Sequence, residues 1–452
     1  MITRFSIENF KSFKSKTSLE IKPITILCGA NSTGKSTLMK SLLLLKQTLL
    51  SSDPTTAVSL EGPYQFSKRL EDLFYLHGKI SDSIQYEFDI KTTEGISGNI
   101  QLTVESGNNE TIENFVKEIK VSDSNENYLH IVREQSKYTV KTNRPQLSYH
   151  LFSKTDKQIA WSDCSVLFQN FVPMMFQINY ENNRSRRVPL ILIDIKGKGS
   201  NLDRIVSEWQ ANLQSIAYLG PLRASPQIAY FQFSKSNFEL DDSGTNSAQV
   251  YWKHENDEIR FNEKVCTLKT AVREAFKLLG MDKSIEVKHS DVMFSFEVGI
   301  TENDTVPISD VGFGLSQSFP VLLKGLLSKP NRLVMFEQPE IHLHPAWKAK
   351  LADLFVAFAK DGRRMIIETH STELIDRLRL LVIQNPKIKN MINIVFVEQT
   401  NMEQTGSVLR PIRLDKYGTP SEWPQGFCDE TTKLMESIVL ARAERSNERT
   451  EK

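Results

Sequence analysis

The chain has 452 residues, of which 40% are hydrophobic and 25% charged, the composition of a folded globular protein with room for roughly two to three domains. Its formal net charge of +1 excludes a protein drawn to nucleic acid by its overall field, so any such contact needs a local basic patch. Four widely spaced cysteines exclude a disulfide framework or a C-x-x-C zinc site, and no apolar run reaches the ~18 residues of a membrane span.

The N-terminal residues predict strands. Residues 1–7 alternate like a strand and lack the apolar core of a signal peptide, so we expect a cytoplasmic protein with no membrane partner. A second strand is predicted over residues 17–21. Residues 24–28 form a short apolar run, which is typical of a parallel strand buried on both faces.

A glycine loop follows this strand and matches the phosphate-binding pattern G-x-x-x-x-G-K-[ST]. A leucine-rich helix is predicted after it, over residues 37–50. Strand, loop and helix in this order direct backbone N–H groups and a helix N-terminus at a polyphosphate. Lys35 would hold the β- and γ-phosphates of ATP, and Ser36 would donate a hydroxyl ligand to Mg²⁺. The predicted nucleotide-binding residues are Gly29, Asn31, Ser32, Thr33, Gly34, Lys35, Ser36 and Thr37.

The middle of the chain predicts a compact α+β region. Alternating runs split by Gly, Asn and Ser clusters predict antiparallel strands between residues 83 and 138. No heptad pattern is sustained anywhere, so no long coiled coil is expected. Further predictions are a strand over 188–193, a helix over 202–213, helix over 246–280 and strand over 285–300.

A second glycine turn lies at residues 309–317, before an apolar helix predicted over residues 319–327. A glycine turn that leads into a helix N-terminus can bind a second anion. Ser309 would supply a hydroxyl, and Gly312 and Gly314 would allow close approach of a ligand.

Two later strands end in polar residues. Within residues 332–340 an apolar strand, Leu333 to Phe336, leads into Glu337, Gln338 and Glu340, so a carboxylate would lie beside Mg²⁺ at the carboxyl end of the strand. Within residues 364–371 another apolar run, Met365 to Ile367, leads to His370. His342 and His344, together with these glutamates, could also suit a metal ion. Residues 393–398 and 407–414 predict a closing hairpin, and a charged tail over 444–452 predicts disorder.

Residues 4–13, at their spacing from Gly29, resemble the opening of ABC-type ATPase heads of chromosome-maintenance (SMC), RecF-like and overcoming-lysogenisation (OLD) proteins. The resemblance implies an α/β P-loop head, a mixed sheet flanked by helices, with a compact insertion in place of a coiled coil. It divides the chain into an N-terminal lobe (1–80), an inserted α+β region (81–300), a C-terminal lobe (301–420) and a short C-terminal domain with its tail (421–452).

The resemblance also implies roles for the later motifs. The 309–317 turn resembles the ABC signature, which binds the γ-phosphate held by a twin molecule, so an ATP-dependent homodimer is implied. Glu337 would serve Mg²⁺, and His370 resembles the switch histidine that contacts the γ-phosphate. Gln338 stands where such heads carry a catalytic glutamate, so either Glu340 acts as the base or hydrolysis is slow, with Gln338 orienting the water. Residues 341–345 resemble the D-loop at the dimer interface.

Residues 217–226 resemble a Tyr-Leu-Gly-Pro-Leu-Arg segment of compact bacterial ATPases, where Arg223 could face a phosphate or a DNA backbone. Such heads are similar to the ATPase subunits of the anti-phage systems Septu and PARIS, which implies a partner effector such as a nuclease or toxin. Two alternatives remain: a RecF-like ATPase that binds DNA, and a scaffold that uses ATP without hydrolysing it. Basic clusters at 184–187 and 196–198 are the candidate DNA contacts.

Overall fold

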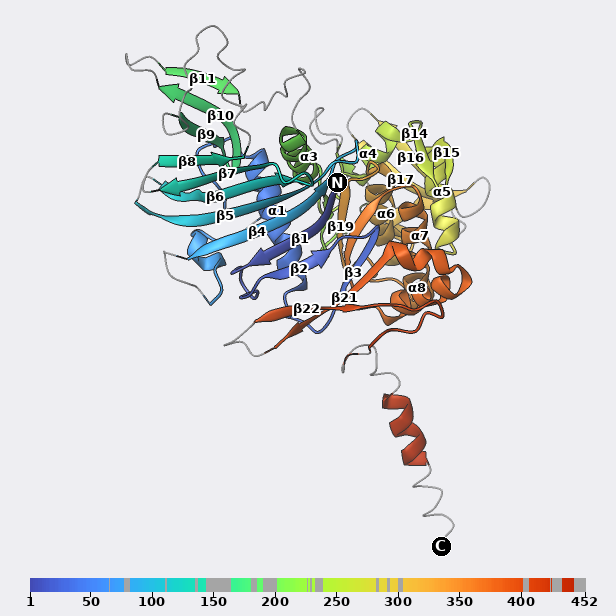
Figure 1. The fold of residues 1–452 in the computed structure, drawn as a ribbon. Helices are drawn as coiled ribbons and strands as arrows, with labels where there is room; N and C mark the ends of the chain where they lie inside the picture. Colours follow the sequence, from blue (N-terminus) through green and yellow to red (C-terminus); the bar gives the residue numbers. More distant parts are fainter. Residues whose placement is uncertain are drawn as a thin grey trace.

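The computed structural model of the chain is shown in Figure 1. It describes residues 1–64, 66–76, 82–109, 112–134, 137–143, 164–179, 185–189, 201–225, 227, 230–231, 239–281, 284–290, 293–299, 304–400, 406–422, 424 and 433–442.

A six-stranded sheet lies at the centre of the fold (Figure 1). Its first five strands are parallel and only the last, at the edge, is antiparallel, which confirms the predicted mixed sheet. The closing hairpin predicted near residues 393–414 is β21 and β22. The strands run in the order β12 (Ala217–Leu219), β19 (Leu333–Glu337), β20 (Arg364–Glu368), β3 (Ile24–Cys28), β21 (Ile392–Gln399) and β22 (Ser407–Ile412).

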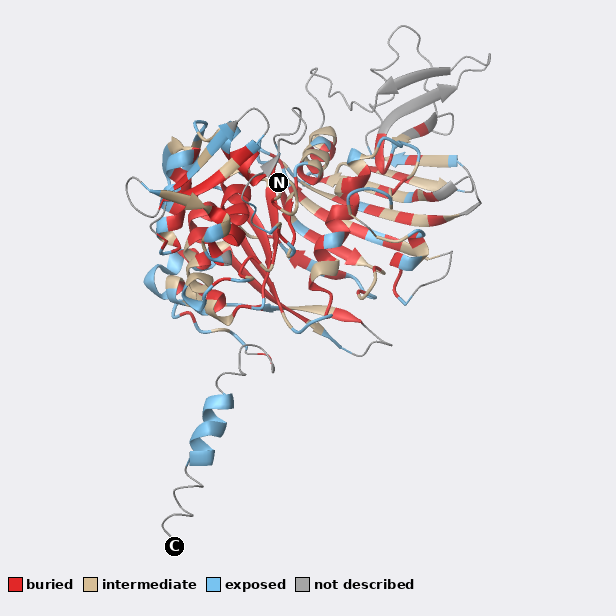
Figure 2. Cartoon of the chain, turned by 180° about the vertical axis from the view of Figure 1, so that it is seen from behind, coloured by how far each residue is buried: buried red, intermediate tan, exposed pale blue. Residues whose placement is uncertain are grey.

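Both faces of this sheet are covered, which explains why its strands are apolar runs (Figure 2). Leu333 and Met335 of β19 point into one core, whereas Val334 and Phe336 point into the other. The first core holds α1 (Lys35–Leu50) and α3 (Asn201–Gln214). The second core holds α4 (Ser247–His254), α5 (Leu268–Leu278), α6 (Phe313–Leu327), α7 (Pro345–Lys360) and α8 (Thr372–Gln384).

A seven-stranded antiparallel sheet closes the first core (Figure 1). Helix α3 packs on it through Trp209, which is fully buried beside Phe88. Strand β1 pairs with β4, so this sheet crosses the predicted domain boundary at residue 80, and β12 of the central sheet lies within the predicted insertion. The order is β2 (Thr17–Glu20), β1 (Ile2–Glu8), β4 (Ser83–Lys91), β5 (Ser97–Asn109), β6 (Ile112–Asp123), β7 (Tyr128–Glu134) and β8 (Lys137–Thr142).

The prediction of helix over residues 246–280 is wrong for the middle of this range, which is not helical. There the chain forms a hairpin of β14 (Glu258–Phe261) and β15 (Lys264–Thr267) between α4 and α5. Its turn has Asn262 and Glu263 at positive φ, and the carboxylate of Asp361 accepts both of their backbone N–H groups at 2.8 Å. A distant side chain therefore stabilises a turn that local periodicity cannot reveal.

The remaining strands form two small sheets. The strand predicted over 285–300 is two antiparallel strands, and the strand predicted over 188–193 ends at Pro189, with the rest outside the described residues. The predicted tail over 444–452 also lies outside them. The strands are β9 (Cys164–Gln169), β10 (Val172–Asn179), β11 (Ser185–Pro189), β13 (Tyr230–Phe231), β16 (Ile285–Ser290), β17 (Met293–Gly299) and β18 (Thr305–Pro307).

No long helix occurs in the described part of the chain: the longest, α1 and α7, have 16 residues each. Short 3-10 turns are η1 (Leu70–Leu73), η3 (Ile308–Asp310) and η4 (Pro386–Met391). A helix over 433–442 stands apart from the other elements in Figure 1, with exposed residues throughout. None of the helices among these residues combines the length and apolar character needed to cross a bilayer.

Candidate active site

The glycine loop lies between β3 and α1, at the carboxyl edge of the central sheet, where ligands of open α/β sheets bind. Gly29 has φ 138°, and a Cβ there would lie 2.2 Å from the carbonyl oxygen of Val397 in β21. Gly34 has φ 105°, and a Cβ there would lie 2.5 Å from Oγ of Ser12. Both positions therefore require glycine, because the loop is pressed against backbone and side chains of the neighbouring segments.

The loop side chains divide into buried and exposed ones. Lys35 is buried, and its ammonium donates to the carbonyl oxygens of Gly29 at 3.1 Å and of Ala30 at 2.6 Å. This burial lowers the pKa of Lys35. The Thr33 hydroxyl also donates to the Ala30 carbonyl, at 3.0 Å. Asn31 and Ser32 are exposed, and Ser36 and Thr37 are half-buried.

Two buried glutamates end neighbouring strands beside this loop. Glu337 ends β19 and Glu368 ends β20, and the two residues are register partners. The Tyr218 hydroxyl donates to Oε1 of Glu337 at 2.9 Å, and the Ser36 hydroxyl donates to Oε2 of Glu368 at 2.7 Å. Burial raises the pKa of both carboxyls; the Glu368 carboxylate raises that of Glu337 further.

Glu368 and Tyr218 were not among the predicted site residues. Glu368 shows the same signal as Glu337, an apolar strand that ends in an acid, and that signal could have found it. Tyr218 carries no such signal, because only the pairing of β12 with β19 brings its hydroxyl to Glu337.

Glu340 lies under the segment that follows β20. Its Oε1 accepts from the Thr369 hydroxyl at 2.7 Å and from the backbone N–H of His370 at 2.9 Å. Its Oε2 is buried and has no hydrogen-bond partner. His370 is exposed by surface area, and partial desolvation of its ring, followed by the charge of the Lys35 ammonium, lowers its pKa.

Gln338 turns the chain after β19. It has φ 45°, a left-handed conformation, and its backbone N–H donates to the carbonyl oxygen of Glu368 at 2.8 Å. Lys35, Glu337, Gln338, Glu340 and His370 are therefore gathered at one edge of the sheet, although three hundred residues separate the first from the others.

Arg223 corrects an expectation. The sequence predicted that it could face a phosphate or DNA, but its side chain is buried and its guanidinium donates to backbone carbonyls. Burial lowers its pKa to about 10, so it stays charged at pH 7. The accepting carbonyls belong to Gln338 at 2.8 Å, Gln317 at 3.3 Å, Glu337 at 3.4 Å and Pro339 at 3.5 Å. Arg223 thus ties the turn after β19 to helix α6.

The second glycine turn has different surroundings. Its helix begins at Phe313, six residues before the predicted start, with Gly312 as the N-cap. Gly312 is exposed, and a Cβ there would have no atom within 4 Å, whereas a Cβ at Gly314 would lie 2.9 Å from the Trp347 ring. The Ser309 hydroxyl donates to the neighbouring Asp310 carboxylate at 3.0 Å. This turn therefore presents an open glycine and a helix N-terminus to solvent.

The His-x-His segment has a structural contact. His344 is the N-cap of α7, and its Nδ1 accepts from the backbone N–H of Ala346 at 3.3 Å. No group of three or more His, Cys, Asp or Glu side chains able to hold a metal ion occurs among the described residues. The side chains of the basic clusters at 184–187 and 196–198 lie outside the described part.

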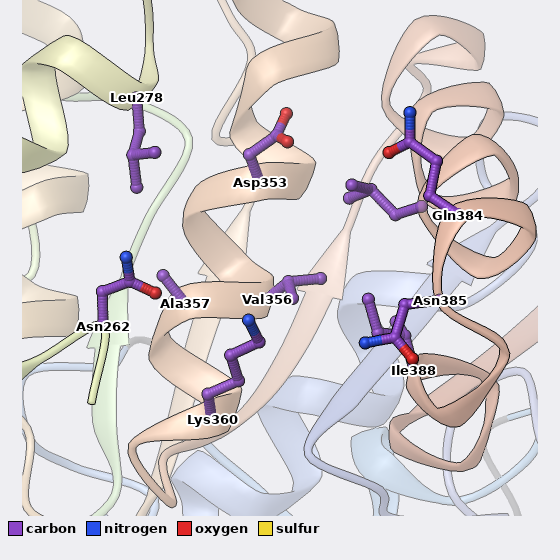
Figure 3. Close-up of a pocket in the computed structure, with 10 residues that line it drawn as sticks. Asn262, Leu278, Asp353, Val356, Ala357, Lys360, Gln384, Asn385 and Ile388 are labelled. Atoms are coloured by element: carbon purple, nitrogen blue, oxygen red, sulfur yellow. The ribbon is translucent and has the colours of Figure 1, made fainter.

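A pocket of about 240 Å³ lies away from this edge, at the Lys360 end of α7 (Figure 3). It is floored by Val356 and Ala357 and rimmed by Lys360 and Asn262, between α5, α7 and α8. Its lining on α7 begins at Asp353, eight residues or about 12 Å from the start of the helix at Pro345, and none of the residues that line it belongs to the phosphate loop.

Three solved structures are similar to this chain. An SMC head bound to the C-terminal winged-helix domain of ScpA is 13% identical, with a TM-score of 0.41 over 92% of this chain and 98% of that one. The SMC head domain from Thermotoga maritima is 11% identical, with a TM-score of 0.39 over 91% and 99%. An SMC head from Pyrococcus furiosus, with an extended coiled coil and bound to the C-terminal domain of ScpA, is 10% identical, with a TM-score of 0.41 over 97% and 99%.

No curated protein matches the sequence significantly. A family model described as an AAA ATPase domain matches residues 1–375, which is most of the chain and includes the phosphate loop, the 309–314 turn and both strand-end glutamates. The chain therefore belongs to the AAA ATPase domain family.

Proposed function

We propose that this protein binds ATP with Mg²⁺ at the loop formed by residues 29–37 and hydrolyses it slowly. Lys35 holds the β- and γ-phosphates, with the backbone N–H groups of the loop and the N-terminus of α1 around them. Ser36 and Glu337 hold Mg²⁺, which neutralises charge on the phosphates. The observation that carries the proposal is the meeting of Lys35, Glu337 and His370 at one edge of the central sheet.

The donor set fits the cation. A serine hydroxyl and buried carboxylates are the hard oxygen ligands that Mg²⁺ prefers. Two neighbouring buried carboxylates also repel each other, so a divalent cation between them would remove an unfavourable interaction.

We also propose that ATP joins two copies of the chain, with the turn of residues 309–314 from one copy contacting the γ-phosphate held by the other. The open space around Gly312 and its place at the N-terminus of α6 support this role. A second copy would then complete each nucleotide site, and His370 would contact the same phosphate from within its own chain.

The catalytic base has two candidates. Gln338 cannot accept a proton but can orient a water. Glu340 keeps one buried oxygen without a partner, which supports a role as the base, while its other oxygen holds Thr369 and His370. Glu340→Gln separates them: a turnover reduced by ~10²-fold or more indicates the base, and an unchanged turnover assigns the water to Gln338.

We place this ATPase in a bacterial anti-phage defence system, as the sensor or motor subunit that controls an effector nuclease or toxin. The compact described fold, with no helix longer than 16 residues, supports a stand-alone head of this kind. The presence of glutamine at position 338, which cannot accept a proton, favours one further candidate: a scaffold in which ATP holds two copies together without being hydrolysed.

Steady-state hydrolysis tests these functions together. An ATP turnover rate per chain that rises with protein concentration supports the dimeric ATPase. An ATP turnover rate that duplex DNA stimulates, together with DNA binding that weakens as salt is added, supports a RecF-like function instead. ATP-dependent dimers with no turnover support the scaffold. Co-purification of a nuclease or toxin from the native host, lost in Lys35→Ala, supports the defence role.

A further inference from the structure

We propose that Glu368 is a second carboxylate ligand of the Mg²⁺ site, and that it shares the ion with Ser36 and Glu337. This inference rests on the proposed ATP site. It differs from the sequence prediction, which assigned the carboxylate ligand to Glu337 alone.

The Ser36 hydroxyl supplies the first argument. It is the side chain that a phosphate loop offers to Mg²⁺, and its contact is Oε2 of Glu368 at 2.7 Å. Ligands at 2.0–2.1 Å from an octahedral Mg²⁺ lie about 2.9 Å apart when they are adjacent. The oxygens of Ser36 and Glu368 therefore already have nearly the separation that two adjacent ligands of one ion need.

The position of Glu337 supplies the second argument. Its Oε1 is held by Tyr218, at the side of β19 that faces away from β20. As register partners on adjacent parallel strands, Glu337 and Glu368 have backbones about 4.8 Å apart, so one ion can reach both carboxylates. Tyr218 fixes one oxygen of Glu337 and leaves the other for the cation.

The local charge supplies the third argument. Glu337 and Glu368 are both buried, at 5% and 4% exposure. Two lysines act on these carboxylates through their charge: Lys40, which is exposed, and Lys35, whose ammonium donates to the carbonyls of Gly29 and Ala30. Binding of phosphate would draw Lys35 further towards the nucleotide. Burial of two carboxylates without an ion-pair partner is unfavourable, and a divalent cation bound between them would offset their negative charge.

The test is a Mg²⁺ titration of the full-length protein with ATP that carries a fluorescent N-methylanthraniloyl group. Glu368→Gln keeps an oxygen that accepts from Ser36 but removes the charge, and we expect it to raise the Mg²⁺ concentration for half-maximal binding by at least about tenfold. Nucleotide binding in EDTA should be unchanged within about twofold. Glu297→Gln, a buried glutamate of β17 that belongs to neither nucleotide motif, is the matched control and should leave the Mg²⁺ midpoint unchanged.

A midpoint for Glu368→Gln equal to that of the unmodified protein overturns the inference and leaves the proposed ATP site intact. Failure of the unmodified protein to bind the nucleotide, with or without Mg²⁺, refutes the proposed function itself. If Glu368→Gln does not fold, Glu368→Asp keeps the charge on a shorter side chain. It should then shift the midpoint by several-fold, and an unchanged midpoint again overturns the assignment.

Discussion

The phosphate loop and the 309–314 turn are both glycine turns that open a helix, yet the protein surrounds them differently. The first is pressed against β21 and the Ser12 segment, and its lysine and serine already contact partners within the chain. The second leaves Gly312 in open space, and its Ser309 hydroxyl donates to the carboxylate of the adjacent Asp310.

This contrast indicates that the phosphate loop serves nucleotide binding and the 309–314 turn serves assembly of two copies. If the phosphate loop and the strand-end glutamates hold ATP and Mg²⁺ as proposed, all of these groups come from one chain, so single copies should bind nucleotide unaided. At the 309–314 turn, a Cβ at Gly312 would meet no atom of the chain within 4 Å, which leaves room for the phosphate of a second copy under the proposed dimer. Substitutions at the two turns should therefore separate binding from assembly.

Lys35→Ala should have the largest effect, because it removes the ammonium that compensates the triphosphate charge. We expect ATP affinity to fall by at least about 100-fold, measured by equilibrium binding of the fluorescent analogue. Lys269→Ala, at an exposed position of α5, is the control and should bind within a few-fold of the unmodified protein. Binding that survives Lys35→Ala would contradict the assignment of the loop.

Ser309→Arg should affect the joining of two chains without affecting ATP binding by a single chain, which would separate the roles of the two turns. The added side chain fills the open turn, so we expect ATP binding by the single chain to stay within about threefold, while turnover falls by about 100-fold as the shared site is blocked. Thr270→Arg, which adds the same group at an exposed position of α5, should change neither quantity. Unchanged turnover in Ser309→Arg would refute the shared site.

Arg223→Lys tests the link between α6, which follows the 309–314 turn, and the turn after β19, because the Arg223 guanidinium donates to carbonyls of both. Lysine keeps the charge but cannot reach four carbonyls, so we expect turnover to fall by about tenfold with ATP binding retained. Arg223→Met should also lower the free energy of unfolding by about 2 kcal/mol, because buried carbonyls lose their donor. An equal loss of ATP binding and turnover would instead indicate a phosphate contact.

The pH dependence of stability should show the smallest effect. Because the pKa of Glu368 is raised above its unfolded value near 4.5, the folded protein binds more protons than the unfolded chain above pH 4.5, and stability falls as pH rises through the raised pKa. In EDTA, Glu368→Gln should therefore gain stability relative to the unmodified protein at pH 8 but not at pH 4.5, measured by urea unfolding.

Glu373→Gln is the control of opposite sign. Hydrogen bonds from Ser371 and its own backbone N–H lower the pKa of Glu373 despite partial burial, so its contribution is present above pH 4.5 and lost as pH falls. Its removal should cost stability at pH 8. The same pH trend in both variants would contradict the account of the carboxylate pair.

The sequence predicts those parts of the candidate site that are formed by residues contiguous in the chain. The strand, glycine loop and helix around Lys35 are contiguous, and the spacing of two glycines and a lysine is enough to specify them. Strand ends at Glu337 and near His370 were also predictable, because an apolar run that stops at a polar residue shows where a buried parallel strand ends.

The rest depends on which strands become neighbours. Glu368 reaches Ser36 because β20 lies between β19 and β3, an order that no local pattern specifies. Tyr218 meets Glu337, and Arg223 lies under the turn after β19, because β12 pairs with β19 across more than a hundred residues. The β14–β15 hairpin was missed for the same reason, since Asp361 stabilises its turn from the end of α7.

The mass of the protein in solution tests the central claim most directly. With Mg²⁺ and a non-hydrolysable ATP analogue at saturation, light scattering should show the mass of two chains for the unmodified protein, and of one chain for Ser309→Arg and for Lys35→Ala. Without nucleotide all three should have the mass of one chain. A single-chain mass for the unmodified protein with the analogue fully bound would contradict the claim that two copies share each triphosphate.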